Sequence, residues 1–143
     1  MAITKGHTRL ASTRMTSVWK WLTRPIHHRD VHQIRLAVEQ RDSAQLEALL
    51  DPDVTVAVAS GHREHPAVRV VRGRYDAVAL LLHGITSAPG FALAERSING
   101  QAGLTLSHKG AVTAAMNIDF TRGAVSGIWV QLCPEMLRNW NAV

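Results

Sequence analysis

The sequence predicts an α+β domain in which helices pack on one face of a curved antiparallel sheet. Helical patterns come first, over residues 27–50, and recur once over residues 75–83. Four apolar, strand-like runs then fill most of residues 91–133 and are separated by short turns. Short apolar runs bounded by Gly-containing turns are typical of consecutive antiparallel hairpins. Helices that are segregated from most of the strands along the chain indicate the α+β class.

The segment over residues 27–50 divides into two predicted helices. An apolar stripe at helical spacing marks the first of them. Asp42-Ser43 interrupts this pattern, and the Ser43 side chain is predicted to cap the second helix. The Asp-Pro-Asp sequence at residues 51–53 is predicted to end that helix, because the residue before a proline avoids the helical region.

Strand patterns follow on both sides of the third helix. Residues 54–59 and 67–71 are predicted to be two strands joined by a polar loop. The third helix, over residues 75–83, is predicted to end at Gly84 as its C-cap. The last four strands are predicted over residues 91–99, 102–108, 111–120 and 124–133. Asn99-Gly100 is the strongest hairpin signal in the chain.

The net charge of +5 is concentrated in the N-terminal part of the 143-residue chain. Residues 1–41 hold eight Lys/Arg and two acidic residues, whereas residues 42–143 hold eight and nine. We therefore expect a basic, flexible leader over residues 1–25 and one domain over residues 26–143. The leader suits a transit peptide, a membrane-surface segment or a nucleic-acid-binding arm. We favour the simpler alternatives, a tail that docks its tryptophans on the domain or an upstream start-codon artefact.

Several classes of protein are excluded by composition. The single cysteine, Cys133, excludes an intramolecular disulfide and a cysteine-based zinc cage. It fits a reducing compartment, and we expect a cytoplasmic protein. The longest apolar runs fall far short of the roughly 20 residues of a membrane-spanning helix. His28 and His32 lie one helical turn apart without an acidic or cysteine partner at a matching spacing, so we expect neither a metal nor a cofactor.

Four short motifs stand in a characteristic order: Leu-Leu-Asp-Pro-Asp-Val at 49–54, Val-Arg-Gly at 71–73, Ile-Asn-Gly-Gln-Ala-Gly-Leu at 98–104 and Ile-Trp-Val-Gln-Leu-Cys-Pro-Glu-Met-Leu at 128–137. In this order and spacing they resemble the SnoaL-like group of the nuclear-transport-factor-2-like (NTF2-like) superfamily. Over residues 30–140 the resemblance is closest to the C-terminal domain of a class of bacterial extracytoplasmic-function sigma factors. Cys133 and Glu135-Met136 depart from the Asn-Pro-Asp-Lys-Leu motif of that group, and residues 60–63 replace its glycine-rich acidic loop.

The resemblance implies a cone-shaped half-barrel with a pocket between the sheet and about three helices, often dimeric through the outer sheet face. It also implies a bacterial protein for which a partner in the transcription machinery is an option. The chain has no room for promoter-binding and polymerase-binding domains, so we expect a stand-alone relative of the sigma-factor domain. The superfamily includes ketosteroid isomerases, epoxide hydrolases, polyketide cyclases and non-enzymatic binding modules, so the fold alone does not decide the activity.

The alternation of apolar residues on the last two strands predicts a homodimer. On residues 111–120 the face with Met116 and Ile118 is the more apolar, which points Asn117 and Asp119 outward. Residues 124–133 are apolar on both faces, which is typical of a strand that is covered on both sides. We therefore expect the outer face to meet a second copy of the chain.

An enzyme of this fold needs a buried carboxylate base with an oxyanion donor, or paired carboxylates around a water. The candidate acids are Asp53, Glu95 and Asp119, and Tyr75 is the only tyrosine. No paired carboxylates stand out among them. We therefore favour a small-molecule-binding or regulatory module. A small-molecule enzyme of the isomerase, cyclase or epoxide-hydrolase type is the alternative, and a purely structural dimerisation unit is the third hypothesis.

The predicted pocket is mostly apolar and binds an apolar small molecule, which one or two polar groups orient. Its predicted lining is Val56, Val58, Leu81, Leu82, Met116, Ile118 and Trp129, with His83 or Gln131 as the polar contact. The alternative is that these side chains simply fill the core of the domain.

Overall fold

The computed structural model describes residues 29–138, so the predicted basic leader lies outside the described residues. Residues 29–39 are helical, and α2 (Ser43–Leu49) follows after a short turn. The third helix begins as α3 (Arg74–Ala79) and continues as a π-helix, η1 (Leu80–Ile85). The strands are β1 (Leu50–Gly61), β2 (Pro66–Arg72), β3 (Phe91–Ile98), β4 (Gln101–His108), β5 (Ala111–Thr121) and β6 (Ala124–Gln131). No helix within residues 29–138 is long and apolar enough to cross a membrane.

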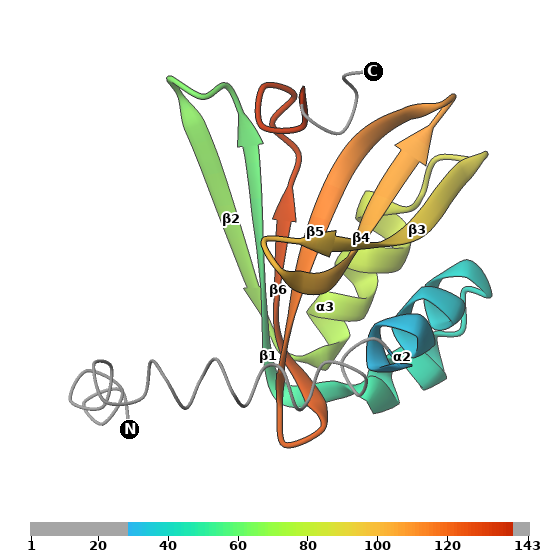
Figure 1. Cartoon of the computed structure of the whole chain (residues 1–143). Coiled ribbons are helices and arrows are strands. Elements are labelled where there is room, and N and C mark those ends of the chain that lie inside the picture. The colour runs from blue at the N-terminus through green and yellow to red at the C-terminus, as the bar shows by residue number, and fades with distance from the viewer. Residues whose placement is uncertain (1–28, 139–143) are drawn as a thin grey trace, which may run out of the picture.

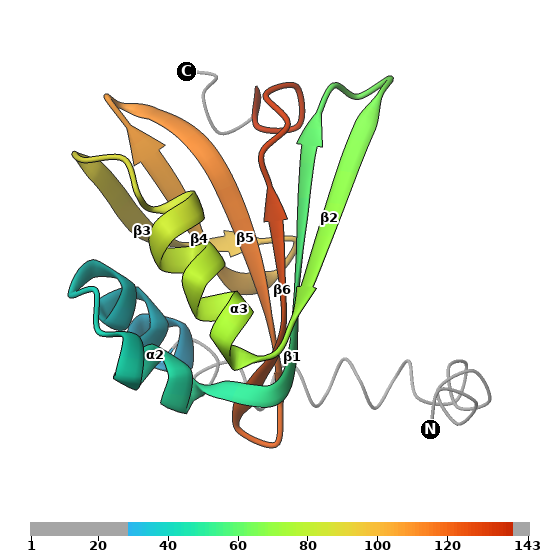
Figure 2. The same cartoon turned by 180° about the vertical axis from the view of Figure 1, so that it is seen from behind.

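The six strands form one curved sheet in the order β2-β1-β6-β5-β4-β3, which does not close into a barrel. Strands β1, β2, β5 and β6 converge near the β5–β6 turn and fan out toward the opposite end, and the helices lie across the concave side of the sheet (Figures 1 and 2). The predicted α+β cone is therefore confirmed. One detail of the prediction is wrong, because the sheet is mixed. β1 pairs parallel with β6 and antiparallel with β2.

The three hairpin turns of the C-terminal half share one conformation. The two central residues of each turn have positive φ: 53° and 79° at Asn99-Gly100, 53° and 84° at Lys109-Gly110, and 54° and 81° at Arg122-Gly123. Positive φ at both positions defines the type I′ turn, whose twist matches that of the two flanking strands. Glycine at the second position adopts this conformation without steric cost, which explains why each turn falls where the sequence predicts it.

Local hydrogen bonds move three predicted boundaries. Asp42 rather than Ser43 caps α2, because its carboxylate accepts a 3.0 Å hydrogen bond from the amide of Gln45. Gly84 lies inside the π-helix and is not its C-cap. The helix closes at Thr86, whose amide and hydroxyl both donate to the carbonyl of Leu81, at 3.2 and 2.6 Å. β1 begins earlier than predicted, so residues 51–53 belong to the strand.

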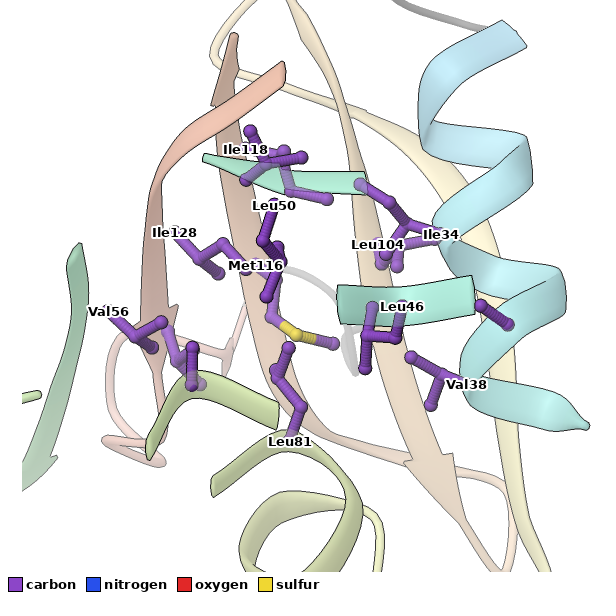
Figure 3. Packing of buried hydrophobic residues seen from close by; sticks show 14 of the residues in the cluster. Ile34, Val38, Leu46, Leu50, Val56, Leu81, Leu104, Met116, Ile118 and Ile128 are labelled. Atoms are coloured by element: carbon purple, nitrogen blue, oxygen red, sulfur yellow. The ribbon is translucent and has the colours of Figure 1, made fainter. Parts of the chain in front are cut away.

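The core lies between the concave face of the sheet and the helices (Figure 3). The helix over residues 29–39 contributes Ile34 and Val38, and α2 contributes Leu46. On β5, Met116 and Ile118 are only 3% and 4% exposed, so the apolar face of this strand points inward as predicted. The fully buried core side chains include Leu46, Leu50, Leu104, Val31, Val54, Val56, Val125 and Val130.

Candidate functional site

The structure divides the predicted pocket residues among three places. The aliphatic side chains and Met116 lie in the core cluster on the inner face of the sheet: Val56, Val58, Leu81, Leu82, Met116 and Ile118. Trp129 and Gln131 lie on the outer face, because they alternate along β6 with the buried Ile128 and Val130. His83 is exposed on η1. The predicted set is therefore not brought together in one pocket.

A cavity of about 470 Å³ lies on the inner side of the sheet, where β1 and β2 face the end of η1. We call it the inner cavity. Its lining is Val58, Ser60, Arg69, Leu80, Gly84, Ile85, Leu106, Thr113 and Leu132. Of the residues predicted from the sequence, only Val58 is among them. Sites for small molecules typically have volumes of about 300–1,000 Å³, so the inner cavity is large enough to hold one.

The π-helix forms one wall of the inner cavity. Three lining residues, Leu80, Gly84 and Ile85, belong to η1. Arg41 holds this wall from the turn that precedes α2, because its guanidinium donates to the carbonyls of Thr86, at 3.2 Å, and Leu82. Insertions that widen a helix into a π-turn occur frequently at functional sites. Here the π-helical segment is the part of the helix that lines the cavity.

Three polar side chains interrupt the otherwise apolar lining. The Thr113 hydroxyl donates to the carbonyl of Leu106 at 3.3 Å, next to a bulge in β5. Ser60 lies near the end of β1. Arg69 lies directly opposite Val58 in the β1–β2 ladder, so both side chains point to the inner side. Within residues 29–138, the exposed side chain of Arg69 forms no hydrogen bond or ion pair, so its guanidinium is available to a ligand.

No carboxylate lines the inner cavity. All eleven Asp and Glu residues of the chain fall within residues 29–138, and none belongs to the lining. Of the candidate catalytic residues, Asp53 and Asp119 are exposed, and Tyr75 is 84% exposed. The described residues therefore supply neither a buried general base nor a pair of carboxylates to this cavity.

The third candidate acid, Glu95, joins β3 to the helix over residues 29–39. Its Oε2 lies 2.7 Å from Nδ1 of His32 and accepts a 2.7 Å hydrogen bond from Nε of Arg35. Partial burial acts to raise the pKa of Glu95, but the hydrogen bonds from His32 and Arg35 outweigh it and lower the pKa. Arg35 also donates to Glu39 at 2.9 Å. Glu95 is therefore an ionised structural contact, whereas a general base at neutral pH needs a raised pKa.

A second hollow lies on the outer face of the sheet, between β5, β6 and the C-terminal segment. We call it the outer groove, and its volume is about 410 Å³. Its lining is Ile98, Asn99, Ala115, Asn117, Trp129, Gln131, Met136 and Leu137. Two of its polar side chains already have partners in the chain. Asn117 donates to the carbonyl of Ile98 at 3.3 Å, and Gln131 accepts from the amide of Cys133 at 3.0 Å.

The outer face around this groove exposes large apolar side chains. Trp129 is 43% and Met136 is 48% exposed. Val68 and Val70 on β2, 56% and 49% exposed, point to the same face, because Val70 and Trp129 both pair with Ala57. In the single chain this face is therefore only partly covered, and its cover by a second copy stays a prediction.

Among residues 29–138, no group of three or more His, Cys, Asp or Glu side chains could hold a metal ion. His32 interacts with Glu95 and Arg35, and His28 lies outside the described residues. The described residues therefore provide no metal centre for the inner cavity.

Comparison with known proteins identifies the fold. No model of a protein family matches the sequence, and no curated protein matches it. Among solved structures, the extracytoplasmic-function sigma factor SigJ of Mycobacterium tuberculosis is 26% identical, with a TM-score of 0.58 over 87% of this chain and 50% of that chain. An NTF2-like protein of unknown function from Burkholderia xenovorans is 15% identical, with a TM-score of 0.56 over 85% and 98% of the two chains. The chain has the NTF2-like fold.

A third similar structure comes from Kribbella flavida and is described as a candidate ketosteroid isomerase. It is 15% identical, with a TM-score of 0.54 over 76% of this chain and 78% of that chain. At this identity the likeness concerns the NTF2-like fold alone. The resemblance to SnoaL-like and sigma-factor domains that the sequence predicts is confirmed at the level of the fold. The chain spans half the length of SigJ.

Arg69, Ser60 and the π-helical wall were not predicted from the sequence as parts of a site. The strand over residues 67–71 was predicted, but not which of its side chains points inward. The signal lies in the pairing of β2 with β1, which sets Val71 opposite the buried Val56 and Arg69 opposite Val58. That pairing depends on a neighbouring strand and not on the local sequence.

Proposed function

We propose that this chain is a small-molecule-binding or regulatory module of the SnoaL-like type, with the inner cavity as its binding site. One observation carries the proposal: the inner cavity combines an apolar lining with three polar groups and no carboxylate. Such a lining suits the binding of a mainly apolar molecule that a few polar contacts orient. The likeness to SigJ supports a regulatory role and makes a partner in the transcription machinery an option.

The alternative, a small-molecule enzyme with a buried carboxylate, has less support. Isomerases, cyclases and epoxide hydrolases of this fold depend on acidic side chains in the pocket. In this chain the acids lie elsewhere, and the pKa of Glu95 is lowered by its ion pairs. The likeness to the protein from Kribbella flavida supplies no catalytic residue.

We also propose that the module is a homodimer through the outer face of the sheet. Exposed apolar side chains on β2, β6 and the C-terminal segment form the surface that a second copy would cover: Val68, Val70, Trp129 and Met136. Contiguous exposed apolar surface commonly marks a site of protein association. We place the module in the cytoplasm, where its buried free thiol, Cys133, stays reduced.

A neutral probe tests the binding site. We expect 2-acetylnaphthalene and a neutral steroid to bind the wild-type chain in isothermal titration calorimetry. Ile85→Trp, which fills the inner cavity, should weaken binding at least about tenfold. Tyr75→Trp introduces the same indole at an exposed position and should leave binding unchanged. Failure of every neutral and charged probe to bind the folded wild type would overturn the proposed function.

A further inference from the structure

We propose that the inner cavity takes an amphipathic monoanion, with an apolar body and one carboxylate that pairs with Arg69. The inference rests on the proposed function and adds the charge of the ligand to it. Four observations support it: the place of Arg69 on the inner face, its lack of partners, the hydroxyl beside it and the apolar remaining walls.

The β1–β2 ladder places Arg69 on the inner face of the sheet, where the residue is exposed and lines the cavity. Val56 is fully buried and pairs with Val71, so the inner residues of β2 are Val71 and, two positions earlier, Arg69. Side chains two residues apart on a strand share one face. Arg72 pairs with Thr55, which alternates with the buried Val54 and Val56, and it therefore lies on the opposite face. Strand β2 thus carries Arg69 on the inner face of the sheet and Arg72 on the outer face.

Arg69 differs from the structural arginines of this chain in having no partner within residues 29–138. Arg35 pairs with Glu95 and Glu39, and Arg74 donates to the carbonyl of Leu50 at 2.9 Å. Arg41 donates to two carbonyls at the end of η1. A guanidinium presents a planar fork of donors that matches a carboxylate in two parallel hydrogen bonds. The unpaired charge at an apolar cavity therefore favours an anionic ligand.

Ser60 extends this donor set. It is two residues from Val58, the residue opposite Arg69, and is therefore the diagonal neighbour of Arg69 across the ladder. The hydroxyl of Thr113 is already engaged with Leu106, which leaves Ser60 as the free hydroxyl donor of the lining. One guanidinium and one hydroxyl match one carboxylate. A dianionic phosphate would leave a negative charge uncompensated, because the lining contains a single cation.

The remaining walls fit the apolar body of such a ligand. Leu80 and Ile85 come from η1, and Leu106 and Leu132 come from the sheet side. Leu80, Ile85 and Leu106 belong to elements that are not adjacent to β2 in the sheet, so a bound molecule would have a charged end and an apolar end. We therefore expect aryl or alkyl carboxylic acids to bind better than neutral molecules of the same shape.

Matched probes test the charge. 2-Naphthoate and 2-acetylnaphthalene have nearly the same shape and differ in charge, and calorimetry measures the affinity of each. We expect the naphthoate to bind about tenfold more tightly, an advantage that shrinks as salt is raised. Arg69→Gln should weaken the naphthoate about tenfold and the ketone less than about twofold. Arg69→Lys should recover part of the loss, since it keeps the charge and loses the fork. Arg72→Gln, on the other face of the same strand, should change neither affinity.

Three outcomes would overturn the inference. Equal affinities for the two probes, unaffected by Arg69→Gln, would rule out a preference for an anionic ligand. The proposed binding site for a neutral molecule would still stand. An equal loss in Arg72→Gln would assign the effect to overall charge. Tighter binding of 2-naphthyl phosphate than of 2-naphthoate would show that the inner cavity prefers a phosphate to a carboxylate. Failure of all probes, by contrast, would overturn the proposed function itself.

Discussion

The two faces of the sheet are both apolar at their centre but differ in what covers them. Three helices cover the inner face, where Ile128 and Val130 of β6 are 3% and 0% exposed. The C-terminal segment covers part of the outer face, where Trp129 of the same strand is 43% exposed. The apolar pattern of a strand therefore shows that a face can be covered, but not which element covers it.

The hollows on the two faces also differ in their polar groups. In the outer groove, Asn117 and Gln131 are already bonded to the chain, so they serve mainly to hold the C-terminal part of the sheet in place. In the inner cavity, the side chains of Arg69 and Ser60 have no hydrogen-bond or ion-pair partner within residues 29–138. This difference is why we assign the ligand to the inner face and a second copy of the chain to the outer face.

Substitution of two methionines, one on each face, tests this comparison. The larger of the two expected losses in the free energy of unfolding is the largest effect that we predict. Met116 is 3% exposed on the inner face, and Met136 is 48% exposed beside the outer groove. We expect Met116→Ala to lower the free energy of unfolding by about 2–5 kcal/mol, because it leaves a hole in the packed core. In the monomer, Met136→Ala should cost less than about 1 kcal/mol, since water reaches this side chain when no second copy covers it. Urea denaturation at equal protein concentration measures both, and equal losses would contradict the difference between the faces.

The second prediction concerns association through the outer face. We expect the wild type to sediment as a dimer at tens of micromolar and Trp129→Lys to raise the dissociation constant at least about tenfold, because large aromatic side chains dominate interfaces. Tyr75→Lys changes an 84% exposed aromatic outside this face and should leave the dimer intact. A wild-type chain that sediments as a clean monomer would show that the outer face stays in water or meets another protein.

Much of the fold could be predicted because its signals are local. The turns Asn99-Gly100 and Lys109-Gly110 lie where the sequence places them. Both central residues of such a turn have positive φ, and glycine at the second position adopts it readily. The parallel pairing of β1 with β6 could not be predicted from such signals. It joins strands separated by most of the domain, and no turn between them sets their register.

The candidate site was less predictable than the fold, for two physical reasons. Single-residue bulges in the β4–β5 and β5–β6 ladders change which residues share a face. The alternation of inward and outward side chains is therefore interrupted within a strand. The buried Val125 and Ile128 both reach the core for this reason, although they are three residues apart. Arg69 was missed because its valine neighbours, Val68 and Val70, are the more apolar choice for the inner face, yet the pairing with β1 points them outward.

The smallest expected effect tests what holds the helices over the inner face. Because hydrogen bonds to His32 and Arg35 lower the pKa of Glu95 below its ordinary value of 4.5, its ionised form is favoured in the folded state. The ion pair therefore stabilises the fold above about pH 4.5, and this contribution is lost as the pH falls through the lowered pKa. The side chain of Glu95 is 29% exposed, so we expect a contribution of about 0.5–1 kcal/mol.

Glu95→Gln should remove this part of the pH dependence in urea denaturation between about pH 5 and pH 3. Glu47→Gln, at an exposed position of α2 outside the ion pairs, should keep the wild-type profile. The C-terminal segment on the outer face has a contact of its own, because Oε1 of Glu135 accepts a 3.1 Å hydrogen bond from the amide of Arg63 and lies 3.5 Å from Nδ1 of His62. A wild-type loss of stability that persists unchanged in Glu95→Gln would mean that the helix is held on the inner face by apolar packing alone.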